Sequence, residues 1–288
     1  MFAVTSCRCL FFVVILNGVK DPCISPLSLP VLESVLSLNS LGQILSDSTA
    51  PPPKSIPKVN HLNTSNKSTG GGGGTPIRAI LFDYGLVLSG PPNPQAWSRL
   101  RSLTTLDEDQ LHTAYWKHRH AYDSGHLQGP SYWRLIAAEF GLPVPTDKHL
   151  TDLYDADTDL WTDLNLPMAE WAQSLQRAQI PTGILSNIGD QMELGVLRKH
   201  PWLESFHHIT WSHRLNTAKP DPEIYRHAAE GLAQSPFNIL FIDDKLENLE
   251  AAHICGMQTI QYSTHQAFVT EVEHRGLSSL LDNPPRLP

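Results

Sequence analysis

The stretch RAILFDYGLVLSG, residues 78–90, decides how the rest of the chain is interpreted. It contains four apolar residues, Ala79 to Phe82, followed by a single carboxylate, Asp83, and Gly85 then interrupts the pattern. A short apolar run without polar alternation is typical of a strand that is covered on both faces in a parallel sheet. An acid at the end of such a strand needs a reason, and the other short motifs of the chain supply one.

Further apolar runs predict a parallel α/β sheet. They lack strict alternation and are separated by helical segments, as in sheets whose strands are joined by crossover helices. One of these helices has Asp221 as its N-cap and Pro222 in the first helical position, and another runs from about Leu246 to Ile254 and stops at Gly256. The predicted strands are Arg78–Phe82, Thr182–Leu185, His207–Trp211, Asn238–Ile242 and Gln258–Gln261.

The long segment between the first two predicted strands contains no convincing strand. Thr105 and Glu108 have the spacing of a capping box, which marks the start of one of several helices there. We therefore expect residues 92–179 to form an all-helical cap inserted into a core of residues 76–91 and 180–288. The segment Tyr122–His126, around Gly125, is where we expect the cap to face the site. The predicted helices span residues 94–103, 106–122, 130–140, 147–161 and 167–179.

Composition restricts the possible partners and the cellular location. The 288 residues carry a formal net charge of −8, and 17% of them are charged. We expect no contact with nucleic acid or with an anionic membrane, because both need a basic face. The four cysteines have the spacing of neither a zinc site nor a disulfide framework, which favours a reduced, cytoplasmic setting. The oligomeric state does not follow from the sequence.

The N-terminal part differs from the rest in composition. The apolar run CLFFVVIL, residues 9–16, follows Arg8 as in a secretory signal. It is shorter than the roughly 20 residues that span a bilayer, and no clean cleavage site follows. From Ser40 to Pro76 the chain is rich in Ser, Pro, Asn and Gly, which is typical of a flexible linker. We interpret residues 1–75 as disordered or as a spurious N-terminal extension of the reading frame.

Polar side chains occur at the ends of four predicted strands or shortly after them, in the motifs FDYG, LSN, AKPDP and FIDDKLEN. The carboxyl ends of parallel strands meet at one edge of a sheet, and open α/β folds bind their ligands there. The motifs would therefore bring carboxylates, one lysine, a hydroxyl and an amide into one site. Its predicted members are Asp83, Ser186, Asn187, Lys219, Asp243 and Asp244.

These residue types suit the hydrolysis of a phosphate monoester. A phosphate dianion repels a carboxylate nucleophile, and Mg²⁺ held by Asp83 and Asp243 would lower that repulsion. Lys219 would neutralise further charge, while Ser186 and backbone N–H groups would hold the phosphoryl oxygens. Asp83 could then attack phosphorus and form an aspartyl-phosphate that water resolves. The expected partner is a small phosphorylated metabolite.

The motifs, in this order around a helical insertion, resemble the haloacid dehalogenase-like (HAD) hydrolases over about residues 77–265. The pattern is most similar to the sugar-phosphate phosphatase group that includes α-glucose-1-phosphate phosphatases. The resemblance implies a Rossmann-like core with sheet order 3-2-1-4-5 and Asp83 as nucleophile. It implies that Mg²⁺ is bound by Asp83, Asp243 and the Gly85 carbonyl oxygen, with Asp244 as a further ligand or holding a metal-bound water. The implied phosphoryl-binding residues are Ser186, Asn187 and Lys219.

Gly85 departs from the phosphatase pattern. Most phosphatases of this superfamily have a second Asp there, as general acid and base, and its loss matters because such catalysis contributes about 10²–10⁴-fold. Three interpretations stay open: the ester has a good leaving group, a cap side chain or water supplies the proton, or the protein binds phosphorylated ligands with little or no turnover. A metal-independent 2-haloacid dehalogenase is a further alternative. It fits less well, because Asp243 and Asp244 are an unusual pair to keep where no cation binds.

Overall fold

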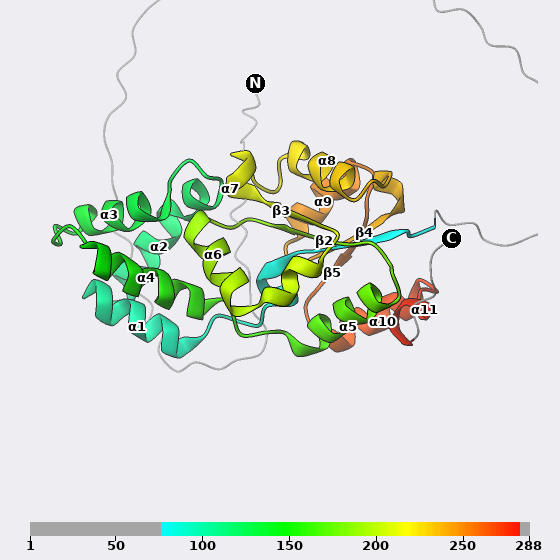
Figure 1. The fold of residues 1–288 in the computed structure, drawn as a ribbon, viewed down its shortest axis with the longest axis horizontal. Coiled ribbons are helices and arrows are strands. Elements are labelled where there is room, and N and C mark those ends of the chain that lie inside the picture. The colour runs from blue at the N-terminus through cyan, green and yellow to red at the C-terminus, as the bar shows by residue number, and fades with distance from the viewer. Residues whose placement is uncertain (1–75, 283–288) are drawn as a thin grey trace, which may run out of the picture. The chain divides into compact units, whose positions relative to one another are not determined.

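The computed structural model describes residues 76–282, and a five-stranded parallel sheet lies at its centre (Figure 1). The strands run in the order β3-β2-β1-β4-β5, which confirms the predicted α/β fold class and sheet order. The features predicted for residues 1–75 lie outside the described residues. The strands are β1 (Ala79–Phe82), β2 (Thr182–Ser186), β3 (His208–Trp211), β4 (Ile239–Asp243) and β5 (Gln258–Gln261).

Both faces of the sheet are covered by helices, which explains the continuous apolar run of β1. Ile80 and Phe82 belong to one core cluster, together with residues of α5 (Leu166–Arg177) and α10 (His265–His274). Ala79 and Leu81 belong to another, with α8 (Pro222–Gly231) and α9 (Leu246–Ile254). All four strand residues are fully buried, so each face of β1 has to be apolar.

Four helices between β1 and β2 form a second layer of structure with its own hydrophobic core (Figure 1). We call this region the cap. Tyr132 and Trp133 are both buried in it, and the Tyr132 ring stacks on Tyr122 with centroids 4.7 Å apart. The cap helices are α1 (Pro94–Thr104), α2 (Glu108–Asp123), α3 (Gly129–Glu139) and α4 (Asp147–Leu160).

The fifth helix of the predicted insertion packs on the sheet. Trp171 of α5 lies edge-on to Phe82 of β1, with ring centroids 5.4 Å apart, and Met168 and Leu175 join the same core cluster. In Figure 1, α5 runs beside α10 and α11 (Ser279–Asp282) on the side of the sheet away from α8 and α9. A periodic apolar face does not reveal which core a helix packs against, so this helix was predicted as part of the cap.

The predicted start of the second cap helix is wrong. Thr105 has a φ of 58° and ends α1 in the left-handed conformation, so it does not serve as an N-cap. The N-cap is Asp107, whose side chain accepts from the Gln110 backbone N–H at 2.9 Å while the Gln110 side chain accepts from the Asp107 N–H at 3.1 Å. The helix therefore begins at Glu108.

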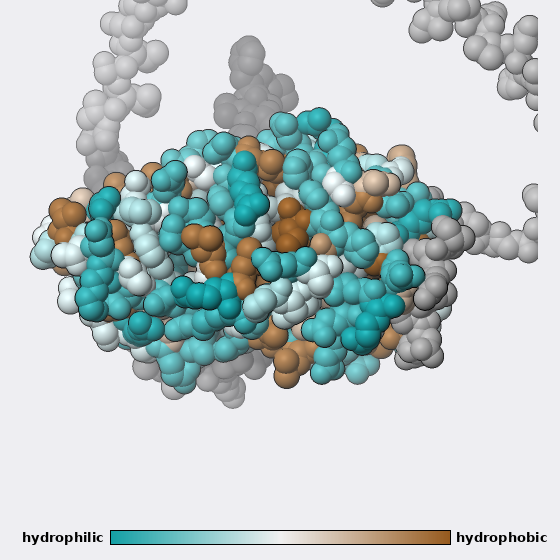
Figure 2. Space-filling model, in the orientation of Figure 1, coloured by the Kyte–Doolittle hydropathy of each residue, from teal (hydrophilic) through white to brown (hydrophobic). Residues whose placement is uncertain are grey.

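The remaining elements are short or peripheral. None of the helices within residues 76–282 is long and apolar enough to cross a membrane. Figure 2 shows one face of the molecule, on which apolar residues are scattered among mainly hydrophilic ones. These remaining elements are α6 (Asp190–Lys199), α7 (Ser212–Leu215) and helical turns at Tyr84–Leu88, Pro201–Ser205 and Pro236–Asn238.

Candidate active site

The register of the sheet brings Asp83 and Asp243 to the same edge. Phe82 of β1 pairs with Ile242 of β4, and each of these two residues is followed in the chain by an aspartate. The Asp83 N–H donates to the Ile242 carbonyl oxygen at 2.8 Å, which extends the ladder by one residue. Asp83 is 7% exposed and Asp243 is not exposed at all, so both carboxylates lie at the floor of the site.

Lys219 connects these two carboxylates. Its Nζ lies 2.8 Å from Asp83 Oδ1 and 2.6 Å from Asp243 Oδ2, and the residue is only 3% exposed. Burial by itself would lower the pKa of Lys219, but the two carboxylates outweigh it and hold that pKa above its ordinary value. The ammonium therefore stays charged within the site.

Asp243 is held from several directions. Its oxygens accept from the Asn248 side-chain amide at 3.0 and 3.1 Å, and its Oδ1 also accepts from the Lys245 backbone N–H at 2.8 Å. A carboxylate that accepts this many hydrogen bonds is fixed in orientation before any ligand arrives. Asn248 ends the FIDDKLEN motif of the sequence, five residues after Asp243 and in the first turn of α9, and its side chain orients this carboxylate.

Three carboxylates cluster tightly enough to hold a metal ion. One oxygen each of Asp83, Asp243 and Asp244 lies within 4.8 Å of the others. Burial raises the pKa of Asp83 to about 7; Lys219 lowers it, and Asp243 and Asp244 raise it further. Burial and the neighbouring Asp243 also raise the pKa of Asp244.

Burial is the main cause of these pKa shifts, and the neighbouring carboxylates add to it. Three carboxylates also face the single ammonium of Lys219, which leaves an excess of negative charge. A divalent cation would balance that excess, and oxygen ligands are the ones that Mg²⁺ prefers. The donor set therefore fits this metal.

The structure places Ser186 and Asn187 at the end of β2, beside this cluster. Ser186 is the last residue of the strand and is buried. The Asn187 side chain bonds the Lys219 main chain in both directions: its Oδ1 accepts from the Lys219 N–H at 2.8 Å, and its Nδ2 donates to the Lys219 carbonyl at 3.0 Å. Asn187 thus fixes the backbone that carries the lysine.

Gly85 is not required by the backbone. Its φ is −63° and its ψ is 129°, which any residue can adopt, whereas Leu86 has a φ of 59°. A Cβ built on Gly85 would meet no heavy atom within 4 Å. Neither the backbone conformation nor the surrounding space requires a glycine at this position. The absence of an acid here therefore concerns the chemistry of the site and not its packing.

The end of α2 in the cap contacts the loops around this edge of the sheet, and sequence reasoning missed the ionic network there. Arg119 donates through Nε to Asp123 at 2.9 and 3.0 Å and through Nη1 to Asp157 at 3.3 Å. Its guanidinium also lies over the rings of Tyr115 and Tyr122. The i, i+4 spacing of Arg119 and Asp123 was the available signal, hidden among the histidines of HRHAYDSGH.

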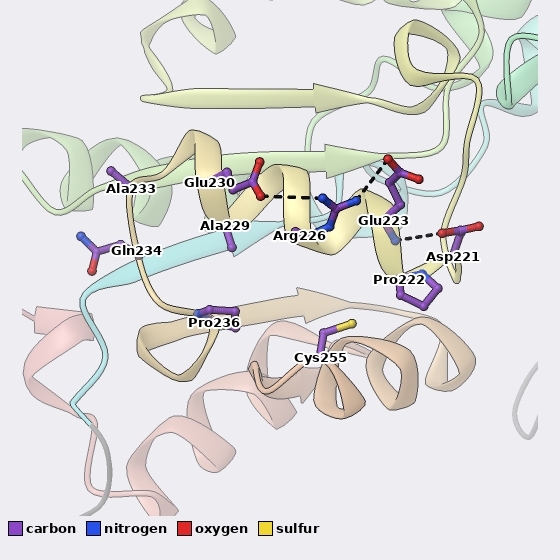
Figure 3. Close-up of a pocket in the computed structure, with 10 residues that line it drawn as sticks. All are labelled: Asp221, Pro222, Glu223, Arg226, Ala229, Glu230, Ala233, Gln234, Pro236 and Cys255. Atoms are coloured by element: carbon purple, nitrogen blue, oxygen red, sulfur yellow. Dashed lines mark hydrogen bonds and ion pairs between the residues drawn. The ribbon is translucent and has the colours of Figure 1, made fainter. Parts of the chain in front are cut away.

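A cavity of about 760 Å³ lies elsewhere, along α8, between that helix and the end of α9 (Figure 3). Arg226, which pairs with Glu223 at 3.2 Å, lines it from α8, and Cys255 lines it from the end of α9. None of the predicted site residues lines this cavity. The chemistry-bearing side chains are gathered at the carboxyl edge of the sheet.

The fold, with its acidic cluster at that edge, defines a class of protein. The family model of haloacid dehalogenase-like hydrolases matches residues 93–256, and the chain belongs to this family. The matched residues include Ser186, Lys219 and Asp243 but begin after Asp83, whose place in the site rests on the geometry described above.

The individual relatives are distant in sequence, and their names indicate different activities. The chain is 26% identical to bifunctional epoxide hydrolase 2 of Sus scrofa over 72% of its own length, and this match spans 40% of the pig protein. It is 26% identical to (S)-2-haloacid dehalogenase 1 of Pseudomonas sp. over 74% of its own length and 97% of that protein. It is 21% identical to N-acetylmuramic acid 6-phosphate phosphatase of Pseudomonas aeruginosa over 73% and 93%.

Solved structures share the fold. HAD family enzyme bt-2542 from Bacteroides thetaiotaomicron aligns with a TM-score of 0.58 at 19% identity, over 68% of this chain and 98% of that one. A second structure of that enzyme, in complex with magnesium and inorganic phosphate, aligns with a TM-score of 0.55 at 21% identity, over 66% and 96%.

Proposed function

We propose that this protein is a Mg²⁺-dependent phosphatase that hydrolyses small phosphate monoesters, sugar phosphates among them, through an aspartyl-phosphate on Asp83. The observation that carries the proposal is the buried cluster in which Lys219 lies within 2.8 Å of both Asp83 and Asp243, with Asp244 beside them. The cluster offers a nucleophile, a cation site and a fixed positive charge at one point.

Each residue has a role in this proposal. Mg²⁺, when bound by Asp83, Asp243, Asp244 and the Gly85 carbonyl, would supply Lewis-acid stabilisation of charge on the phosphoryl group. Asp83 attacks phosphorus and the ester oxygen leaves with the bonding electrons; water then bonds to phosphorus, the bond from phosphorus to Asp83 breaks, and inorganic phosphate is released. Lys219 and Ser186 face the equatorial oxygens, and Asn187 positions Lys219 through its main chain.

The relatives support this reading at the level of reaction class. One relative is named as a phosphatase of a sugar phosphate, and a structural neighbour is described in complex with magnesium and inorganic phosphate. A small phosphorylated metabolite is the proposed partner, since the acidic chain offers little to nucleic acid or anionic lipid. The unpaired Cys255 is consistent with a cytoplasmic location.

A 2-haloacid dehalogenase is the second candidate, because one relative, matched over 97% of its length, carries that name. Such an enzyme would use Asp83 and Lys219 without a metal. Three carboxylates against one ammonium would then face a substrate that is itself an anion, which is electrostatically unfavourable. The balance of charge therefore favours the phosphatase.

Phosphate release from a panel of esters tests the proposal. Sugar-1-phosphates, acetyl phosphate and sugar-6-phosphates are incubated with the wild type, with and without Mg²⁺, and with Asp83→Asn. An exposed acid of the cap, Asp109→Asn, is the matched control. Metal-dependent release that is lost only in Asp83→Asn supports the phosphatase. Halide release from a 2-haloacid without metal, with no phosphate release, would replace it by the dehalogenase.

A further inference from the structure

The missing acid at Gly85 has a candidate replacement in the cap. We propose that Asp123, the last residue of α2, is the proton donor to the leaving oxygen and the base for the attacking water. This inference rests on the proposed phosphatase function. It is carried by the position of Asp123 against the three segments that follow β2, β3 and β4 at the edge of the sheet.

The loop after β2 and the start of α7, which directly follows β3, hold the end of α2 in place. The Ser212 hydroxyl donates to the Asp123 carbonyl oxygen, and the same hydroxyl accepts from the Ile188 N–H at 2.8 Å. Ile188 directly follows Ser186 and Asn187 of the candidate site. The backbone of Asp123 is therefore two hydrogen bonds away from the predicted phosphoryl-binding segment.

Residues on either side of Asp123 approach the same segments of the core even more closely. The Tyr122 ring lies so near Gly189 that a Cβ there would come within 2.2 Å of it, and the Tyr122 hydroxyl accepts from the Met192 N–H at 3.3 Å. On the other side, a Cβ on Gly125 would come within 2.3 Å of the His213 carbonyl. Asp123 stands between these two close approaches, so its position relative to the sheet edge is fixed.

The loop after β4 completes the surroundings of Asp123. Burial is the largest influence on the pKa of Asp123 and raises it to about 6, and Lys245, which follows Asp243 and Asp244, is close enough to lower it slightly. Arg119 also lowers it and Asp157 raises it. The side chain is 15% exposed, so it is largely desolvated but keeps some accessible surface. A carboxyl with this pKa is suited to both donating and accepting a proton near neutral pH.

The proposed steps balance in atoms and charge. In the first, an Asp83 oxygen bonds to phosphorus, the bond from phosphorus to the ester oxygen breaks, and the Asp123 proton goes to that oxygen. In the second, the Asp123 carboxylate takes a proton from water as the water oxygen bonds to phosphorus. The bond from phosphorus to Asp83 then breaks, inorganic phosphate leaves, and Asp123 is protonated again.

The dependence on leaving group tests this role. An aryl ester such as p-nitrophenyl phosphate needs no proton on its leaving oxygen, whereas an alkyl phosphate does. In Asp123→Asn we expect kcat/KM for the alkyl ester to fall about 10²-fold or more, with a much smaller change for the aryl ester. The matched control is Asp157→Asn, which removes the other carboxylate partner of Arg119 and should affect both esters equally.

A second variant keeps the test decisive if Asp123→Asn perturbs the cap. Gly85→Asp restores the acid of the phosphatase pattern at a position with open space. Combined with Asp123→Asn, it should recover alkyl phosphate hydrolysis at least tenfold relative to Asp123→Asn alone. Equal losses on both esters, or no recovery in the double variant, would overturn the role of Asp123. A wild type that hydrolyses no ester would instead overturn the phosphatase itself.

Discussion

The surroundings of Asp83 explain why the buried apolar strand β1 is followed by an acid. An isolated buried carboxylate is costly, and the structure offsets the cost by placing the Lys219 ammonium between Asp83 and Asp243. The arrangement is a compensated charge cluster that becomes unbalanced if one member is removed. Its stability and its chemistry therefore depend on the same three side chains.

Removing the ammonium should destabilise the fold. In Lys219→Met, Asp83 and Asp243 lose their partner, and the free energy of unfolding at pH 8 without metal should fall by about 3–5 kcal/mol. Urea denaturation measures it, and added Mg²⁺ should restore part of the loss. The control is Lys148→Met, which breaks the exposed pair with Asp152 and should cost less than about 1 kcal/mol. Equal losses in the two variants would contradict the account of the cluster.

The pH dependence of activity should follow Asp123. Its protonated form is the proposed donor, and because the pKa of Asp123 is raised to about 6, that form is lost as the pH rises above this value. We expect kcat/KM for alkyl phosphates to decline above about pH 6, and kcat/KM for p-nitrophenyl phosphate to lack this limb. A decline shared by both esters would assign the titration to another group.

The contact between α2 and the β2 loop positions the cap. In Gly189→Ala, the new methyl group would come within 2.2 Å of the Tyr122 ring, so the end of α2 has to shift. We expect about 1–3 kcal/mol of destabilisation together with a lower kcat/KM. Steady-state kinetics and urea denaturation measure the two effects.

Gly141→Ala is the matched control for that contact. Gly141 follows α3 at a φ of 63°, and a Cβ there meets no atom within 4 Å. This variant should lose roughly 1–2 kcal/mol through backbone strain while kcat/KM is unchanged. If Gly189→Ala behaved in the same way, the contact would have no part in positioning the cap.

The limits of an element could be predicted where the residues that mark them are unambiguous in the local sequence. The range of α9, Leu246–Ile254, matches the prediction because the following Gly256 marks its end locally. The range of β5, Gln258–Gln261, matches as well. The start of α2 was misplaced because two capping patterns overlap at residues 105–110, and only the conformation of Thr105 separates them.

The candidate site likewise contains some residues that could be predicted from the sequence and others that could not. Asp83 and Asp243 could be brought together from sequence, because the chain order of parallel strands determines which residues share an edge. Asp123 could not be assigned to the site from the sequence, because its place depends on how the end of α2 packs against Gly189 and Ser212. No local pattern encodes that contact. The role of Asn187 also escaped prediction, because its bonds to the Lys219 main chain join residues 32 positions apart.

The molecule as a whole carries an acidic excess that a cation at the site would reduce. At a Mg²⁺ concentration about 100 times the dissociation constant, the native state should gain roughly 2.7 kcal/mol. The corresponding rise in Tm is roughly 2–4 °C per kcal/mol for a domain of this size. Differential scanning calorimetry measures it, with Ca²⁺ for comparison. Asp243→Asn should abolish the rise, and an equal rise in that variant would place the metal elsewhere.

The proposed function depends on Asp83 as the attacking group. The most direct measurement is to quench the protein with acid during turnover of acetyl phosphate in Mg²⁺ and to locate the phosphoryl group by peptide mass spectrometry. We predict an acid-stable, hydroxylamine-sensitive phosphoryl group on the peptide that contains Asp83, absent in Asp83→Asn. Rapid phosphate release with no phosphorylated peptide, or with the group on a different residue, would contradict this account.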